Sequence, residues 1–196
     1  MGIADLSAVL RAARLLHDRL PEVAAFAPWP VDMVPGNLAP LDIPAARQVA
    51  GFAHRGNRDT QPLIDAITAS TAHGHWTRTY SEAEVGAHFL ETYGYYELFG
   101  PNGHFRSPDL RAYVAYWGPG LDYAWHSHAA EEMYVVLAGQ ARFRSRRQGD
   151  AVLGAGQTRV HAGHESHAMV TDGQPVLTYV LWRGAGLSDL PAMDSA

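Results

Sequence analysis

The stretch Gly120–Gly139 reads GLDYAWHSHAAEEMYVVLAG, and it places several metal-ligand residue types in a run of strand-forming side chains. His126 and His128 stand one residue apart, Glu132 follows four residues later, and Tyr134 two residues after that. Because successive side chains of a strand point to opposite faces, His126 and His128 share one face. Glu132 and Tyr134 share a face of the following strand. The spacing therefore predicts two imidazoles, a carboxylate and a phenol converging inside a β-structure.

A divalent cation would satisfy this group of buried ligands. An unpaired buried carboxylate costs several kcal/mol, and neutral imidazoles also need partners. A fourth ligand could come from His161, His164 or His167. We favour His167, because it starts a predicted strand whereas His164 lies in a glycine-flanked loop. The competing interpretation is a surface loop of exposed histidines, since a lone His-X-His is weak evidence.

The predicted ligand set does not choose the metal. Three nitrogens and one oxygen suit one divalent transition metal, which could be Zn, Fe, Mn, Co or Ni. Because no cysteine takes part and a coordination position is open, we expect a Lewis acid or redox centre rather than a structural clamp.

The spacing in this stretch resembles the first motif of the cupin superfamily. Its fixed positions are matched by Gly120, His126, His128, Glu132 and Gly139. The resemblance implies a cupin-type double-stranded β-helix, that is, a jelly-roll barrel.

The second cupin motif is matched more loosely. Gly156 keeps the turn glycine and His167 the final histidine, but His161 stands where a proline is usual. One extra residue precedes the final histidine, and no asparagine follows it. These departures bear on the fourth ligand more than on the first three.

Composition places the chain among globular proteins. Its 196 residues are 47% hydrophobic and 18% charged, with a net charge of −5, so we expect one domain with an appendage and no nucleic-acid partner. The lack of cysteine excludes disulfides, thiolate metal sites and cysteine nucleophiles.

Neither a signal peptide nor an apolar window of about 18 residues is found, which predicts a cytoplasmic protein with no membrane contact. Of the eleven histidines, five lie between residues 126 and 167.

The hydrophobic pattern changes near Gly94 and divides the chain into three predicted parts. Residues 1–93 are expected to form an N-terminal helical segment packed on the barrel, residues 94–187 the cupin β-barrel, and residues 188–196 a loosely held tail. Aromatic and β-branched runs separated by glycine turns are typical of a sandwich or small barrel. The predicted strands are 95–99, 111–117, 132–137, 141–145, 151–153, 158–161, 167–171 and 176–182. A tight hairpin turn is predicted at 138–140. The fold class is mainly β with N-terminal helices.

Helix signals are confined to the first half. Apolar residues recur at helical spacing from Leu6 to Leu16, and Pro62 opens a second predicted helix. Ser81 and Glu84 match a capping box, with Val85, Phe89 and Tyr93 as the buried stripe that follows. Five prolines in residues 26–44 predict an extended, packed connection.

Two tyrosines accompany the predicted ligands, Tyr134 after Glu132 and Tyr123 before His126. A phenol with its ordinary pKa near ~10 is a poor base at neutral pH. A nearby divalent cation favours the phenolate and makes it a usable general base. A core tyrosine bonded to backbone fits the spacing equally well. The other aromatics expected at the cavity are mostly core, and a few could form a cage for an onium cation; they are Tyr95, Tyr96, Tyr113, Tyr116, Trp117, Trp125, Tyr179 and Trp182.

Longer blocks around these residues resemble the cupin dimethylsulfoniopropionate (DMSP) lyases, nearest the branch called DddL. The resemblance covers about residues 76–187, and its blocks are 80–85, 93–100, 116–134, 167–169 and 181–186. It implies a carbon–sulfur lyase that converts DMSP to dimethyl sulfide and acrylate by β-elimination. By the resemblance, Tyr134 is the general base and Tyr123 orients the substrate or assists. The resemblance also implies His126, His128, Glu132 and His167 as the metal ligands, with the phenol at ligand distance in some states of the family.

Two other functions share these features. One is a different metal-dependent cupin enzyme, a dioxygenase, isomerase or decarboxylase, which gives Tyr134 no necessary role. The other is a non-catalytic cupin that senses or stores a small acid. Release of dimethyl sulfide from DMSP separates the lyase from both. The expected partner is a small sulfonium carboxylate, and edge strands in small barrels often pair, which favours a homodimer.

Overall fold

The computed structural model describes residues 2–194, with side chains from residue 6 onward. Its helices are α1 (Gly2–Arg19), α2 (Pro21–Phe26), α3 (Pro44–Ala50), α4 (Gln61–Ser70), α5 (Glu82–Val85) and α6 (Ala87–Thr92), with a 3₁₀ turn η1 at Thr71–His73. The apolar stripe of α1 is buried, as are Leu63, Ile64 and Ile67 of α4. The capping box of Ser81 and Glu84 is present at α5. These helix predictions are confirmed.

The first half differs from the expectations in three details. The helices α2 and α3 were not expected, and each begins at a proline, whose fixed φ and missing N–H suit the first turn of a helix. The connection between them is extended, as predicted, and contains the short strand β1 (Val34–Pro35), but most of its side chains are exposed and not packed. Tyr93 does not continue a helical stripe, because it opens a strand.

The remaining elements are almost all strands. They are β2 (Tyr93–Gly100), β3 (Phe105–Arg106), β4 (Leu110–Trp117), β5 (Asp122–Ser127), β6 (Glu131–Ser145), β7 (Ala151–Gly154), β8 (Thr158–His161), β9 (His167–Val170), β10 (Val176–Arg183) and β11 (Ala192–Met193). The path of neighbouring strands is β1-β3-β2-β4-β10-β6-β9-β5-β11, and β7 and β8 also pair with β6. Pairing is antiparallel except between β2 and β3.

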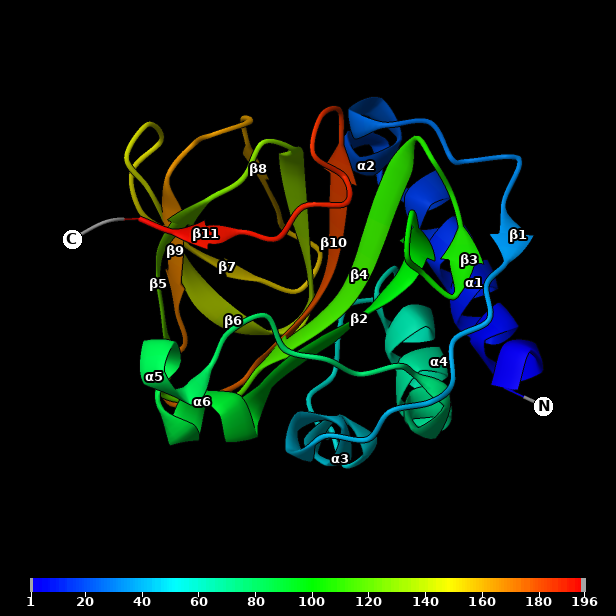
Figure 1. The fold of residues 1–196 in the computed structure, drawn as a ribbon, viewed down its shortest axis with the longest axis horizontal. Coiled ribbons are helices and arrows are strands. Elements are labelled where there is room, and N and C mark those ends of the chain that lie inside the picture. The colour runs from blue at the N-terminus through cyan, green and yellow to red at the C-terminus, as the bar shows by residue number, and fades with distance from the viewer. Residues whose placement is uncertain (1, 195–196) are drawn as a thin grey trace.

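Strand β6 joins the two sheets of the barrel. Its first half pairs with β10 and β8, and its second half pairs with β7 and β9. In Figure 1 helices α1 to α4 gather on one side of the β2-β4-β10 sheet, and the barrel closes on the other side, where α5 and α6 lie at one end of it. This is the mainly β, cupin-type barrel with N-terminal helices that the sequence predicts.

The predicted hairpin turn at 138–140 is wrong, because β6 runs through it without reversing. Gly139 has a φ of 75°, and a Cβ there would lie 1.9 Å from the carbonyl oxygen of Pro175. Only glycine fits so close an approach in this conformation. The residue therefore bends a continuous strand from one sheet into the other, with the β10 register shifting close by.

Strands β2, β4, β10 and β6 lie at the centre of the sheet and bury both of their faces. Leu98, Val114, Val135 and Leu181 belong to the core cluster shared with the helices. The chain neighbours of Val114, Val135 and Leu181 point the other way, into a second cluster inside the barrel. The barrel interior is thus separated from helices α1 to α4 by one layer of backbone, whereas Phe89 of α6 packs into the interior cluster.

The C-terminal segment is not the loose tail expected from the sequence. After β10 the chain crosses the barrel and β11 pairs with β5, placing Met193 opposite His126 (Figure 1). The amide of Asp194 also donates to the carbonyl of Trp125 at 2.9 Å. Within residues 2–194, no helix has the length and apolar character needed to cross a bilayer.

Candidate metal centre and active-site pocket

Three predicted ligands meet inside the barrel. His128 directly follows β5, Glu132 lies near the start of β6, and His167 is the first residue of β9. All three are buried, and one ligand atom from each lies within 4.8 Å of the others. Glu132 Oε2 is 3.0 Å from His167 Nε2 and 3.4 Å from His128 Nε2. One carboxylate oxygen and two imidazole nitrogens therefore face a common point.

Backbone carbonyls fix the tautomers of these rings. His128 Nδ1 lies 3.0 Å from the carbonyl of Ala130, and His167 Nδ1 lies 2.8 Å from that of Glu165. Because a carbonyl oxygen only accepts, each Nδ1 carries the hydrogen in the neutral ring. The lone pair then sits on Nε2, which is the arrangement of metal-binding histidines whose other nitrogen is held by a carbonyl.

His126 lies beside this group but outside it. It pairs with His167 across β5 and β9, and the two ring centroids are 4.2 Å apart. Its Nδ1 is held by the carbonyl of Ala124 at 2.8 Å, and its ring stacks on Tyr123 with centroids 4.0 Å apart. Burial lowers the pKa of His126 well below its usual value, so the ring is neutral.

The other two candidate histidines have different surroundings. His164 is exposed in the loop before β9, with a φ of 59°. His161 is fully buried on β8, and its ring stacks on His167 with centroids 4.1 Å apart and planes 11° from parallel. Neither ring nitrogen of His161 finds a hydrogen-bond partner within residues 2–194. Burial, with the neighbouring His167, lowers the pKa of His161 to about 4.

Electrostatics make Glu132 an anion. Burial opposes its ionisation, but His128 and His167 outweigh burial and hold its pKa well below the usual range. Trp182 on β10 donates its indole N–H to Glu132 Oε1 at 2.7 Å. That bond occupies one carboxylate oxygen and leaves Oε2 for the two imidazoles.

A pocket with mostly aromatic walls opens beside Glu132. It is lined by Thr79, Tyr93, Tyr95, Tyr113, Ala115, Trp117, Tyr123, Glu132, Tyr134, Val180, Trp182 and Pro191. Both predicted catalytic tyrosines are in this wall. Burial and the charge of Glu132 raise the pKa of Tyr134 well above its ordinary value. The hydroxyl of Tyr123 forms a hydrogen bond with that of Tyr80 at 2.8 Å, and burial raises the pKa of Tyr123 as well.

The aromatics expected around the cavity divide by strand alternation. Tyr95, Tyr113, Trp117 and Trp182 line the pocket. Tyr96, Tyr116 and Tyr179 belong instead to the core under the helices. The ring of Trp125 contacts the guanidinium groups of Arg144 and Arg146. The two-residue alternation of side chains along β2, β4 and β10 would have separated the rings that line the pocket from those in the core under the helices.

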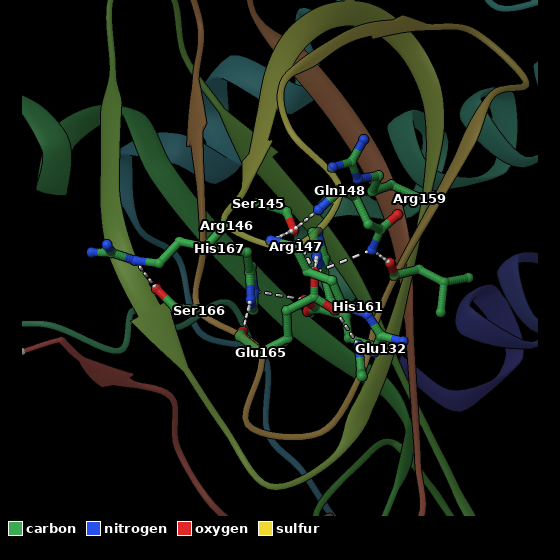
Figure 2. A network of polar contacts seen from close by, with 12 residues as sticks. Glu132, Ser145, Arg146, Arg147, Gln148, Arg159, His161, Glu165, Ser166 and His167 are labelled. Atoms are coloured by element: carbon green, nitrogen blue, oxygen red, sulfur yellow. Dashed lines mark hydrogen bonds and ion pairs between the residues drawn. The ribbon is translucent and has the colours of Figure 1, made fainter.

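Glu165 is a supporting residue that sequence reasoning missed. It accepts hydrogen bonds from the Ser145 hydroxyl, the Gln148 amide at 3.2 Å and the Ala162 backbone at 2.8 Å (Figure 2). Burial opposes its ionisation, but these bonds outweigh burial and lower its pKa to about 2. Its carbonyl holds His167, so this network fixes the loop that presents a ligand. The only signal in the sequence is its place two residues before His167.

Fold and site together define a cupin-type β-barrel with a buried histidine–glutamate centre and an aromatic pocket. The family model described as dimethylsulfoniopropionate lyase matches residues 39–178. The chain therefore belongs to the DMSP lyase family, whose members are carbon–sulfur lyases. The family expected from the sequence is confirmed.

Individual relatives agree with this assignment. The chain is 35% identical over 176 residues to dimethylsulfoniopropionate lyase DddQ of Ruegeria pomeroyi DSS-3, covering 90% of this chain and 88% of the relative. The crystal structure of that DddQ superposes with a TM-score of 0.91 at 33% identity, over 97% of this chain and 96% of the other. A chain from the crystal structures of the DMSP lyases RdDddP and RnDddQII matches with a TM-score of 0.96 at 46% identity, over 100% of both chains. The names of these relatives include DddQ and DddP, and none of them is the expected DddL.

Proposed function

We propose that this protein cleaves DMSP to dimethyl sulfide and acrylate with the help of one divalent transition metal. The observation that carries the proposal is the placement of Glu132 and Tyr134 on one face of β6, where both line the aromatic pocket. The relatives named as DMSP lyases, which match over nearly the whole chain, support the same substrate.

The donor set fits a metal ion. His128 Nε2, Glu132 Oε2 and His167 Nε2 are buried, and within residues 2–194 none has a partner with the geometry of a hydrogen bond. Leaving such groups unsatisfied costs about 1–3 kcal/mol each, so a shared cation is favoured. We assign these three as ligands and His126, whose ring contacts His167, as the fourth. The metal would be Zn, Fe, Mn, Co or Ni.

The pocket suits a sulfonium carboxylate. Several tyrosine and tryptophan rings surround it, and ring faces attract onium cations when water is excluded. The substrate carboxylate would lie at the end that holds the histidines and Glu132. A bound metal would supply Lewis-acid stabilisation of the negative charge that develops there.

Tyr134 would take the α-proton. The Cα–H bond breaks, its electron pair forms the C=C bond of acrylate, and the Cβ–S bond breaks with its pair leaving on sulfur as dimethyl sulfide. In the protein alone, burial and Glu132 hold the pKa of Tyr134 above its ordinary value. The phenolate therefore needs a cation close by, which the adjoining centre can hold. Tyr123, bonded to Tyr80 and stacked on His126, would position the substrate.

The test is an assay on purified protein with DMSP, which reads dimethyl sulfide in the headspace and acrylate in solution. Equal amounts of both products are expected, with metal present in the sample by mass spectrometry. Extraction by a chelator should abolish release, and one of the candidate metals should restore it. Absence of dimethyl sulfide from the metal-loaded protein would overturn the proposal.

Two histidine variants make a matched pair for the ligand assignment. His167→Ala should lose metal and product release together. His164→Asn should keep both, because His164 is exposed and asparagine tolerates its positive φ. Loss of metal in His164→Asn with retention in His167→Ala would reverse the assignment.

A further inference from the structure

The C-terminal segment forms part of the pocket wall. After β10 it passes over the barrel and ends as β11 beside β5 (Figure 1). Pro191, in the middle of the segment, lines the same pocket as Glu132 and Tyr134. Residues on either side of it, Leu187 and Met193, pack against the barrel-interior core. The segment is therefore a wall of the site and not a solvated end.

Arg111 on β4 holds the near end of this segment. Its Nη1 donates to the carbonyl oxygens of Leu187 at 2.6 Å and Asp189 at 3.1 Å. Its Nε donates to Glu97 Oε2 at 2.8 Å, and both side chains are buried. One planar guanidinium thus bonds a carboxylate and two carbonyls at once, which a lysine ammonium cannot reproduce in this geometry.

The same guanidinium contacts two rings of the pocket. It lies 4.5 Å from the ring centroid of Tyr113 and 5.4 Å from that of Trp182. Trp182 in turn donates to Glu132 and stacks on His128 with centroids 4.0 Å apart. Arg111 is therefore joined to the pocket both through the C-terminal segment and through these rings, without lining the pocket itself.

Stability alone does not account for a buried charge at this position. Replacing a buried ion pair by packed apolar side chains is often neutral or stabilising. Glu97 also keeps a pKa above its usual value, because burial outweighs the attraction of Arg111. What Arg111 adds over an apolar residue is the fixed position of the carbonyls of Leu187 and Asp189, and hence of the wall that follows them.

The far end of the segment is held separately. Strand β11 pairs with β5, and the Ser166 hydroxyl donates to the Asp194 carboxylate. Both Ser166 and Asp194 are partly accessible, so substitution there should not disturb the core. The segment is thus fixed at two ends, with Pro191 between them.

We propose that Arg111 is a positioning residue, which fixes residues 187–194 as a wall of the pocket and thereby sets the affinity for the substrate. The proposal rests on the proposed lyase function for its kinetic readout. Its structural readout, amide hydrogen exchange in residues 187–194, does not depend on that function. The role of Arg111 and the lyase function can therefore fail separately.

The test compares Arg111→Lys with Glu97→Gln. Arg111→Lys keeps the charge beside Glu97 but cannot bond both carbonyls. Its KM for DMSP should rise about tenfold, which equals about 1.4 kcal/mol, while kcat changes little. Amide hydrogen exchange in residues 187–194 should become faster. Glu97→Gln keeps an oxygen that accepts from Arg111, so it should lower stability without changing KM or this exchange.

A second variant covers the case in which Arg111→Lys does not fold. Asp194→Ala removes the side-chain bond to Ser166 and weakens the attachment of the far end, so it should also raise KM and speed exchange over residues 187–194. Unchanged KM and exchange in whichever of these variants folds would overturn the proposal, as would equal effects of Glu97→Gln and Arg111→Lys. If the wild-type protein released no dimethyl sulfide, the lyase proposal would fail, and the exchange data would still decide whether Arg111 holds the segment.

Discussion

On strands β2, β4, β10 and β6, the side chains that face the helices are largely aliphatic, whereas those that face the barrel interior are rich in aromatic rings. Leu181 and Trp182 show the contrast at adjacent positions of β10. Leu181 packs in the core under the helices, and Trp182 bonds Glu132 in the site. A single backbone thus supports two environments with different requirements.

The two faces differ in how polar groups are grouped, since the Tyr179 hydroxyl on the helix-facing side, unsatisfied among the described residues, lies among apolar side chains. On the interior face, His128, Glu132 and His167 hold buried atoms that lack hydrogen-bond partners within residues 2–194, and aromatic walls leave a pocket between them. The helix-facing side fills its space with close-packed apolar groups, which is how cores gain stability. Substitutions on the two faces should therefore separate activity from stability.

The largest expected effect is on the interior face. Glu132→Gln keeps the size of the side chain and an acceptor for Trp182, but it removes the anionic ligand. Metal content should fall, and DMSP cleavage should drop by at least about 10³-fold, since metal catalysis of this kind supplies several kcal/mol. Metal analysis and the dimethyl sulfide assay on one sample measure it. Full activity without metal would remove the centre from the mechanism.

On the helix-facing side, Leu181→Ala should lower the free energy of unfolding by about 2–5 kcal/mol, because it leaves a cavity in a packed core. The activity of the folded fraction should stay near that of the wild type. Denaturant unfolding and kcat at a permissive temperature give the two numbers. A large loss of kcat with little loss of stability would show that the two faces are not independent.

Trp182→Phe removes the indole N–H that bonds Glu132 but keeps an aromatic ring. Metal affinity should weaken by about 10–100-fold, as is typical when a group that orients a ligand is lost. Stability should change less than in Leu181→Ala. A chelator competition titration measures the affinity, and an unchanged value would mean that this bond does not orient Glu132.

The smallest effect concerns acid stability on the helix-facing side. His104 Nε2 accepts the amide hydrogen of His75 at 2.9 Å, and burial lowers the pKa of His104 from 6.5 to about 4. As the pH falls, His104 takes up a proton in the unfolded chain before it does so in the folded protein. The stability present above pH 6.5 is therefore lost as the pH falls toward 4. His104→Gln should make that slope shallower by about one proton. Unfolding free energies measured from pH 7 to pH 4 would show no difference if His104 stayed protonated in the folded state.

The sequence predicted those features of the fold and site that depend on the spacing of residues along the chain. Strand-like runs separated by glycine turns predicted the barrel, and the spacing of His126, His128, Glu132 and Tyr134 predicted that these side chains converge inside it. Gly139 was misread, because a glycine with positive φ serves a bend as well as a turn. Side-chain alternation along each strand decides which aromatic rings face the pocket, and this alternation can be read from the sequence.

Other features depend on contacts between distant segments. The attachment of residues 187–194 through Arg111 joins positions 76 and 78 residues apart, which no local pattern reports. The same holds for the bond between Tyr80 and Tyr123. The division into residues 1–93, 94–187 and 188–196, and the homodimer, stay predictions.

The central claim is that the phenol of Tyr134 in the aromatic pocket removes the α-proton of DMSP. Tyr134→Phe deletes one oxygen and leaves the ring and the histidine–glutamate centre in place. The measurement is dimethyl sulfide release by this variant, with metal content determined on the same sample. We predict a fall of about 10²–10⁴-fold in kcat, or about 3–5 kcal/mol, with near-normal metal content. Near-native release would contradict the account and move the base to Tyr123.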